Sequence, residues 1–266
     1  MDEPHPVGTP RQEIHIWRVP LVQPQTVADR LEQLLDSEER ERAARFHFAE
    51  DRIRYTIAHG ALRSILARYL NQAPADLSFQ RGRFGKPCLS FPTEPRGRKR
   101  AAGRRESGAA PAQPSPALHF NLSHSRDLAV IAACSQRLVG VDVETVRDVG
   151  NLDSIVKRYF TAEEKRFLSS AATGEHPRAL LTLWSRREAA AKALGLDLSA
   201  ALADVQVPAF PPGEAIEAPR LADLETDHGE KRPVWFIRDL ELDEGHVGAV
   251  CHEGRQIPVV HRDFDG

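Results

Sequence analysis

Two carboxylates that stand two positions apart, Asp142 and Glu144 in residues 140–144 (GVDVE), form the first group that could do chemistry. On a β-strand alternate side chains point to the same face, so these two would lie side by side and the valines would face the other way. Neighbouring carboxylates repel each other unless a cation lies between them. A hard divalent ion such as Mg²⁺ takes oxygen ligands of this kind. A solvated polar face at a strand end explains the segment equally simply, and for the segment alone that interpretation is favoured.

A second group lies in residues 184–192 (WSRREAAAK), where Trp184, Glu188 and Lys192 recur every four positions. On a helix this spacing places the three side chains along one stripe. An exposed Glu–Lys pair stabilises a helix by only a few tenths of a kcal/mol, and the tryptophan would then be ordinary core. A glutamate and a lysine on an otherwise apolar face also fit a reaction site. The segment alone leaves both interpretations open.

Two further segments could contact phosphate. Residues 119–125 (HFNLSHS) bring together an amide, two hydroxyls and the imidazole of His124, although such residues also form Asx and Ser turns without any ligand. That simpler interpretation is favoured for the segment alone. Residues 82–87 (GRFGKP) resemble a phosphate-binding loop loosely, because they lack the spacing of a P-loop.

The order and spacing of the four segments carry more information than any one of them. Together they closely resemble the 4′-phosphopantetheinyl transferase superfamily, and the length and two-part layout resemble its Sfp-type branch, whose members are monomers. The resemblance runs from about Arg40 to Cys251 and excludes residues 92–117. It implies an enzyme that moves the 4′-phosphopantetheine arm of coenzyme A to a serine of an apo acyl- or peptidyl-carrier protein. The implied by-product is adenosine 3′,5′-bisphosphate.

The resemblance also implies roles for individual residues. By similarity Asp142, Glu144 and Glu188 would hold Mg²⁺ against the pyrophosphate of coenzyme A. Glu188, or a water beside the metal, would accept the serine proton, and Lys192 would stabilise the leaving group. The other matched positions contact coenzyme A: Arg42 at the 3′-phosphate, Lys86 at the nucleotide end, and Ser123 and His124 at the phosphates.

The chain departs from the family pattern at two positions. Arg187 stands where the family usually has lysine, and because a guanidinium is not geometrically equivalent to an ammonium, we assign it no role. Glu39 stands where some members have lysine, which weakens the expected nucleotide contacts near Arg42. Arg45 and Arg54 are looser candidates in the same basic region.

The elements that must position these residues mix strands and helices throughout the chain, which favours the α+β class. Periodicity predicts strands near 14–21, 119–122, 128–133 and 138–143, a long helix after residue 40 that is broken near 47–51, and a helix at 177–194. The resemblance implies two similar α+β halves related by pseudo-twofold symmetry, with coenzyme A between them. In this chain the halves would be about 14–117 and 118–256.

Residues 92–117 differ from the rest in composition. They contain six Lys or Arg, two Glu and many Pro, Gly, Ala and Ser residues. Such a segment cannot bury enough apolar surface to offset its chain entropy, so a disordered loop is predicted. It has no aromatic residue to stack on bases, which does not favour nucleic acid. Its charge would aid docking of an acidic carrier protein, but a solvated loop is the favoured interpretation.

Composition sets the remaining limits. The 266 residues contain 36 Lys and Arg against 38 Asp and Glu, which excludes a uniformly basic surface. The longest apolar run, 128–134, is far shorter than the ~20 residues of a membrane helix, and the first ten residues do not resemble a signal peptide. Three distant cysteines, Cys88, Cys134 and Cys251, favour neither a disulfide framework nor a zinc cluster. We therefore expect a cytoplasmic enzyme without membrane attachment, and the resemblance to the Sfp-type branch implies a monomer.

Two alternatives use the same residues differently. A Mg²⁺-dependent phosphohydrolase could employ the same carboxylates, and a non-catalytic binder of coenzyme A or nucleic acid could be built around residues 96–105. The sequence also leaves open which carrier protein would be served, because fatty-acid, polyketide, nonribosomal-peptide and siderophore carriers all fit.

Overall fold

The computed structural model describes residues 10, 12–81, 87–90, 118–148, 153–196, 205–207, 209, 216–217, 220–221 and 234–266. The loop predicted at 92–117 and the predicted nucleotide contact Lys86 lie outside these residues.

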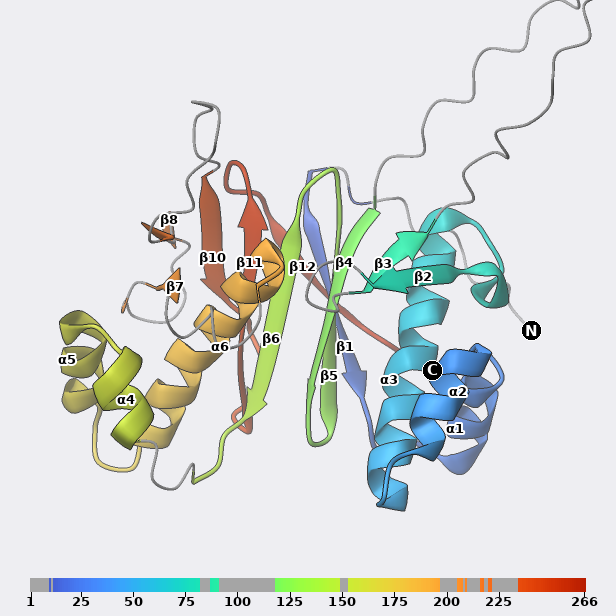
Figure 1. Cartoon of the computed structure of the whole chain (residues 1–266), viewed down its shortest axis with the longest axis horizontal. Helices are drawn as coiled ribbons and strands as arrows, with labels where there is room; N and C mark the ends of the chain where they lie inside the picture. The colour runs from blue at the N-terminus through green and yellow to red at the C-terminus, as the bar shows by residue number, and fades with distance from the viewer. Residues whose placement is uncertain are drawn as a thin grey trace, which may run out of the picture.

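Runs of helices and runs of strands follow one another along the chain, which confirms the predicted α+β class (Figure 1). In chain order they are β1 (Ile14–Pro20), α1 (Gln25–Glu32), α2 (Ser37–Ala44), α3 (Ala49–Leu70), the 3₁₀ helix η1 (Pro74–Asp76), β2 (Ser78–Arg81), β3 (Pro87–Ser90), β4 (Leu118–Ser125), β5 (Leu128–Ser135), β6 (Val139–Thr145), α4 (Asp153–Tyr159), α5 (Ala162–Ser170), α6 (His176–Leu194), β7 (Val205–Gln206), β8 (Ile216–Glu217), β9 (Arg220–Leu221), β10 (Trp235–Asp239), β11 (His246–Glu253) and β12 (Val259–Asp263). The predicted break in the long helix is the gap between α2 and α3.

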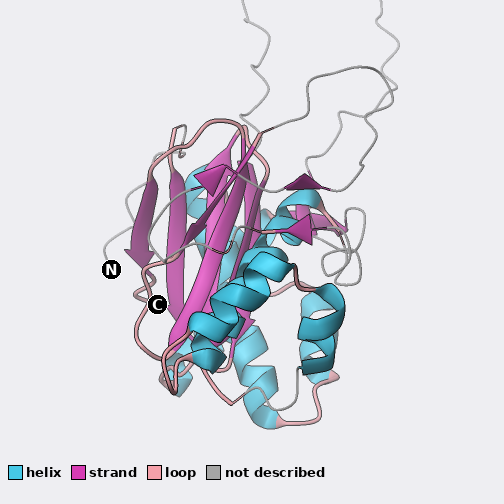
Figure 2. Cartoon of the chain, turned by 90° about the vertical axis from the view of Figure 1, so that its left-hand side faces the viewer, coloured by secondary structure: helices cyan, strands magenta, loops and turns pink. Residues whose placement is uncertain are grey.

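Two four-stranded sheets occupy the centre of the molecule, in the orders β12-β1-β5-β4 and β6-β11-β10-β8. Helices α1 to α3 flank the first sheet, and α4 to α6 lie beside the second (Figures 1 and 2). Each sheet thus has its own long helix, α3 or α6, and the predicted arrangement of two similar α+β halves is confirmed. Because β1, which precedes residue 117, pairs with β5 and β12, which both follow it, the division of the chain into 14–117 and 118–256 stays a prediction.

The apolar run at residues 128–134 forms β5, a strand that is buried on both faces. Its odd-numbered residues, such as Ile131, pack in the core around α3, whereas its even-numbered residues, such as Val130, pack in a core between the sheets. Alternation along a strand requires this division. A continuous apolar run is typical of a strand covered on both sides.

Strand β6 presents its two faces to different neighbours. Val139, Val141 and Val143 belong to the core between the sheets. The opposite face approaches α6 closely at Gly140, where an added Cβ would lie 2.2 Å from both Ala189 O and Ala193 N. Glycine therefore allows the helix backbone to rest directly on the strand. This contact brings the turn of α6 that carries Glu188 and Lys192 beside β6.

Among the described helices, none combines the length and apolar character needed to cross a bilayer.

Candidate active site

Three polar side chains from three elements meet between the halves. Lys192 of α6 donates through Nζ to Asp142 Oδ1 at 2.7 Å and to Ser123 Oγ at 3.0 Å. The Ser123 hydroxyl of β4 in turn donates to Asp142 Oδ1 at 2.8 Å. Asp142 of β6 is only 4% exposed. The structure thus brings together a buried carboxylate, an ammonium and a hydroxyl that the sequence placed in three separate segments.

Glu144 and Glu188 complete a cluster of three carboxylates around this centre. Burial raises the pKa of Asp142, and the positive charge of Lys192 opposes that rise. The pKa of Glu144 is raised by burial and then by the charge of Asp142. Burial also raises the pKa of Glu188, and the charges of Asp142 and Glu144 raise it further. The three groups are therefore close enough to repel one another, which is the condition under which a cation stabilises such a cluster.

The cluster has the donor chemistry of a site for a hard divalent cation. Within the described residues, no three His, Cys, Asp or Glu side chains are placed so that they could hold a metal ion as they stand. Asp142 has one oxygen, Oδ2, that is buried without a hydrogen-bond partner among those residues. An unsatisfied buried carboxylate oxygen beside two further carboxylates suits Mg²⁺, which takes oxygen ligands. The residues therefore fit the ion in their chemistry.

Polar side chains of β4 fix the position of β6. Three alternate residues of β4 each accept a hydrogen bond from the backbone of β6 across the boundary between the sheets. These bonds join Val141 N–H to Asn121 Oδ1 at 2.8 Å, Val143 N–H to Ser123 Oγ at 3.4 Å, and Thr145 N–H to Ser125 Oγ at 3.0 Å. They satisfy backbone donors that have no sheet partner on this edge. Ser125 also donates to Glu144 Oε2 at 3.2 Å, so the same strand orients both carboxylates of β6.

His124 connects the carboxylate cluster with the first half of the molecule. Its side chain is exposed, unlike those of its neighbours Ser123 and Ser125. Desolvation lowers the pKa of His124, and the positive charges of His59, Lys192 and Arg42 lower it further. Cationic groups from α2, α3 and α6 therefore surround this imidazole.

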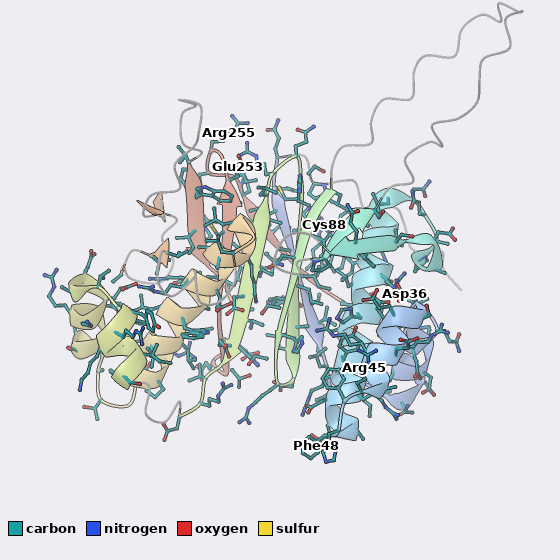
Figure 3. All side chains as sticks on the ribbon, viewed as in Figure 1. Asp36, Arg45, Phe48, Cys88, Glu253 and Arg255 are labelled. Atoms are coloured by element: carbon teal, nitrogen blue, oxygen red, sulfur yellow. The ribbon has the colours of Figure 1, made fainter. Side chains whose placement is uncertain are left out.

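Arg42 lies on the exposed face of α2, over an aromatic ring. Its Cζ is 5.6 Å from the centroid of Tyr55, a distance suited to a cation–π contact. Both side chains line one cavity together with Glu39, His59, Phe79, Gln80 and Pro87, the residue directly after Lys86. Arg45 and Arg54 do not line this cavity. Arg45, labelled in Figure 3, is exposed and pairs with Glu41.

Glu39 has a structural reason to replace lysine. It forms a capping box with Asp36 at the start of α2, in which each side chain accepts the other residue's backbone N–H. The same carboxylate accepts from Arg63 Nε at 2.6 Å and lies 3.4 Å from His59 Nδ1. Burial alone would raise the pKa of Glu39, but the hydrogen bonds from His59 and Arg63 lower it below its ordinary value.

Arg187 likewise has a structural partner. Its guanidinium donates to Glu164 of α5 at 2.7 and 2.8 Å from Nη2 and at 3.1 Å from Nε. Its Cζ lies 4.9 Å from the ring centroid of Phe160. The arginine therefore fastens α6 to α5, and its neighbour Glu188 lies on a helix held in place by this buried ion pair.

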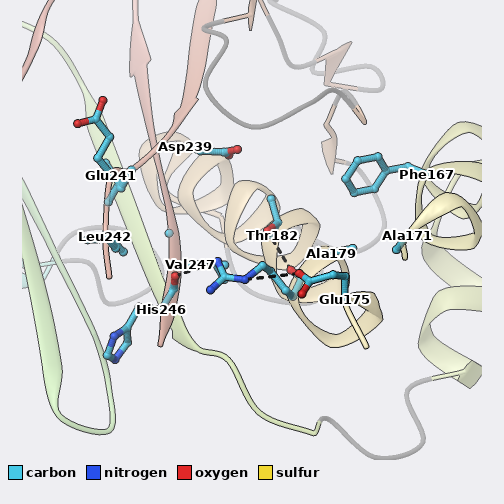
Figure 4. A pocket seen from close by; sticks show the side chains of 13 residues that line it. Phe167, Ala171, Glu175, Ala179, Thr182, Asp239, Glu241, Leu242, His246 and Val247 are labelled. Carbon is cyan, nitrogen blue, oxygen red and sulfur yellow. Dashed lines mark hydrogen bonds and ion pairs between the residues drawn. The ribbon is translucent and has the colours of Figure 1, made fainter. Parts of the chain in front are cut away.

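A second cavity, of about 460 Å³, lies between α6 and the strands β10 and β11 (Figure 4). It is lined in part by Glu175, Arg178, Leu242 and His246. None of the predicted site residues lines it. Arg178 instead donates to the backbone carbonyls of Glu244 and His246.

Comparison with known proteins identifies the family. The 4′-phosphopantetheinyl transferase superfamily matches residues 138–251, and the N-terminal region of 4′-phosphopantetheinyl transferases matches residues 23–136. The 4′-phosphopantetheinyl transferase HetI of Nostoc sp. is 36% identical over 242 residues, which cover 91% of this chain and 88% of HetI. The chain belongs to the 4′-phosphopantetheinyl transferase superfamily. Sfp of Bacillus subtilis is 27% identical over 237 residues, covering 89% of the chain and 87% of Sfp. These matches confirm the Sfp-type resemblance and the enzyme class.

In this phosphopantetheinyl transferase the predicted site residues form two groups. Asp142, Ser123 and Lys192 are in direct contact, with Glu144 and Glu188 close by. Arg42 and His124 lie on the side of α2 and α3. From the sequence, Asn121 and Ser125 were only possible phosphate contacts, and their role in positioning β6 was not predicted. The involvement of His59 was not predicted either.

Proposed function

We propose that this phosphopantetheinyl transferase moves the 4′-phosphopantetheine arm of coenzyme A to a serine hydroxyl of an apo acyl- or peptidyl-carrier protein. The reaction depends on Mg²⁺ and releases adenosine 3′,5′-bisphosphate. The observation that carries this proposal is the contact of Lys192 and Ser123 with Asp142 inside a cluster of carboxylates. The enzyme acts as a cytoplasmic monomer, without nucleic acid or membrane as a partner.

Lys192 provides the positive charge at the centre of the site. The attack of a serine on the β-phosphorus of coenzyme A spreads negative charge over the pyrophosphate oxygens, and this charge must be neutralised. The ammonium, held by Asp142 and Ser123, is already positioned beside the place where the pyrophosphate binds and stabilises the leaving group. Ser123 acts here by orienting Lys192.

Asp142, Glu144 and Glu188 would hold Mg²⁺ in the same place. The ion would supply Lewis-acid stabilisation of the pyrophosphate. Binding of a cation also relieves the repulsion that raises the pKa values of these three residues.

Glu188 accepts the proton of the carrier serine. A general base works best when its pKa lies near the working pH, and burial moves the pKa of Glu188 upward in that direction. Its position on α6, one turn before Lys192, places the base and the cation that stabilises the leaving group on one helix face.

The nucleotide end of coenzyme A binds on the first half of the molecule. Arg42 faces the 3′-phosphate, His124 contacts the phosphates, and Lys86 contacts the nucleotide. Arg42 lines a cavity that Pro87 also lines.

The proposal is tested by incubating the enzyme with several apo carrier proteins, coenzyme A and Mg²⁺. Intact mass should show addition of the ~340 Da arm that the transfer reaction predicts. Chelation of the metal should prevent the addition. The proposal is wrong if no apo carrier gains mass.

The two alternatives give different results in the same assay. A phosphohydrolase would release phosphopantetheine without any carrier protein, whereas the transferase should do so only very slowly. A non-catalytic binder built around residues 96–105 would lose binding when 92–117 is deleted, whereas the transferase should keep most of its activity.

A further inference from the structure

His59 has no part in the roles proposed above, although it lines the same cavity as Arg42. It lies on α3 and stacks on Tyr55, with ring centroids 4.0 Å apart and an interplanar angle of 26°. The guanidinium of Arg42 contacts the same tyrosine. One aromatic ring therefore holds a guanidinium and an imidazole at a single cavity.

Glu39 fixes the orientation of this imidazole. Its Oε1 lies 3.4 Å from His59 Nδ1. The pKa of Glu39 lies below its ordinary value, so near neutral pH the side chain is a carboxylate that can only accept hydrogen bonds. Nδ1 therefore carries a hydrogen, and Nε2 on the other side of the ring is directed away from Glu39. In other proteins a carboxylate that accepts from one ring nitrogen holds a functional histidine in the same way.

The charges of the other residues around the cavity determine whether His59 is needed to attract an anion. Asp36, Glu38 and Glu39 contribute three carboxylates to its lining. Asp36 and Glu39 are paired with Arg63, a buried arginine. Among the described lining residues, the groups left to attract an anion are Arg42 and His59. The charge of His59 is also the largest electrostatic influence on the neighbouring His124.

We propose that His59 is a specificity-determining residue that, together with Arg42, recognises the 3′-phosphate of coenzyme A. The inference rests on the proposed function above, because that function makes coenzyme A the ligand. A phosphate monoester carries nearly two negative charges and accepts several hydrogen bonds. The guanidinium of Arg42 donates such bonds, and the phosphate charge itself favours the protonated imidazole ring, whose Nε2–H donates as well. Glu39 thus contributes indirectly at a position where the family resemblance suggested a lysine, by holding the histidine.

The test measures discrimination between two ligands that differ only in this phosphate. Calorimetry gives the dissociation constants of coenzyme A and 3′-dephospho-coenzyme A for the full chain and for His59→Gln, whose amide can still donate to Glu39. The wild type should prefer coenzyme A. His59→Gln should weaken coenzyme A binding about tenfold and leave 3′-dephospho-coenzyme A unchanged. Because the ratio of the two constants is taken within each variant, a partly inactive preparation does not alter it.

Two further variants sharpen the result. His47→Gln changes an exposed histidine that does not line the cavity, and it should keep the wild-type ratio. His59→Phe keeps a ring to stack on Tyr55 but removes both nitrogens, and it should lose discrimination as His59→Gln does. In the transfer assay both His59 variants should raise KM for coenzyme A while kcat stays within about twofold.

The outcomes separate this inference from the proposed function. If His59→Gln keeps the wild-type ratio, or weakens both ligands equally, His59 does not recognise the phosphate, even if the enzyme transfers normally. If the ratio collapses but no carrier protein is modified, the recognition stands and the proposed function fails.

Discussion

The two ends of the site are built in opposite ways. At the carboxylate end, Asp142 is buried, its strand is held by side chains of β4, and Lys192 reaches it from a helix resting on Gly140. At the other end, proposed to bind the nucleotide and called the nucleotide end below, Arg42 and His124 are exposed, and Arg42 is held by the face of an aromatic ring.

This difference fits the task that we propose for each end. A group that takes part in bond breaking must be held within a fraction of an ångström, and burial with several hydrogen bonds achieves this. A group that attracts a charged ligand works through a longer-ranged force and tolerates movement. We therefore expect substitutions at the carboxylate end to reduce kcat and substitutions at the nucleotide end to raise KM.

The largest effect is expected for Asp142→Asn. The amide keeps the volume but removes the charge that holds Lys192 and would hold Mg²⁺, so kcat should fall by about 10³-fold or more. The rate of carrier modification by mass spectrometry measures this. Glu253→Gln, at the far end of β11 (Figure 3), is the matched control and should transfer normally. A fall of less than tenfold for Asp142→Asn would place the metal site elsewhere.

Lys192→Met should lower kcat by about 10²-fold and also change the pH profile. The positive charge of Lys192 lowers the pKa values of Asp142 and Glu188, so its loss raises both. The carboxylates then ionise only at higher pH, and the acidic limb of the profile of kcat should move toward alkaline pH. Lys157→Met, at an exposed position of α4, is the control. A lower kcat with an unmoved acidic limb would show that the lysine does not act on these carboxylates.

The sequence predicted the parts of the carboxylate end that depend on local pattern. Alternation along residues 140–144 placed Asp142 and Glu144 on one face of β6, and helical spacing placed Glu188 and Lys192 on one face of α6. The α+β class and the family were also predicted, and both are confirmed.

What the sequence did not predict depends on contacts between distant elements. The polar residues of β4 matched an ordinary turn as well as a phosphate site, because nothing local shows that β4 lies beside the edge of β6. In the sequence, Glu39 indicated only weaker nucleotide contacts. Its structural role depends on Arg63, 24 positions later in the chain, which donates a hydrogen bond to its carboxylate. His59 lies in a mainly apolar helix, where a single histidine carries no signal of its own.

At the nucleotide end, Arg42→Gln should raise KM for coenzyme A about tenfold and leave kcat nearly unchanged. Because the arginine is exposed, added salt should screen its attraction, and the difference from the wild type should shrink as ionic strength rises. Arg45→Gln, outside the cavity, should behave as the wild type. Steady-state kinetics at two salt concentrations decide the matter, and a fall in kcat with unchanged KM would contradict the division of roles between the two ends.

The smallest predicted effect is a change in stability. It is a gain, whereas the other predicted effects are losses of activity or affinity. Glu188→Gln should remove most transfer activity but stabilise the metal-free protein at neutral pH. The pKa of Glu188 is raised in the folded state by burial and by the charges of Asp142 and Glu144. A carboxyl group of this kind supports folding while it is protonated, and that support is lost as the pH rises through its folded-state pKa.

The two proteins should therefore unfold at similar temperatures below the ordinary pKa of glutamate, where the carboxyl group is protonated in both states. Above the raised pKa, Glu188→Gln should be more stable by about 1 kcal/mol, which corresponds to a Tm higher by about 2 °C. Thermal denaturation in chelator across this pH range measures the difference, with Glu163→Gln on the exposed side of α5 as the control. A variant that is less stable than the wild type at neutral pH would mean that Glu188 is held by attractive contacts. The carboxylates would then not form the strained, cation-requiring cluster that distinguishes this end of the site from the other.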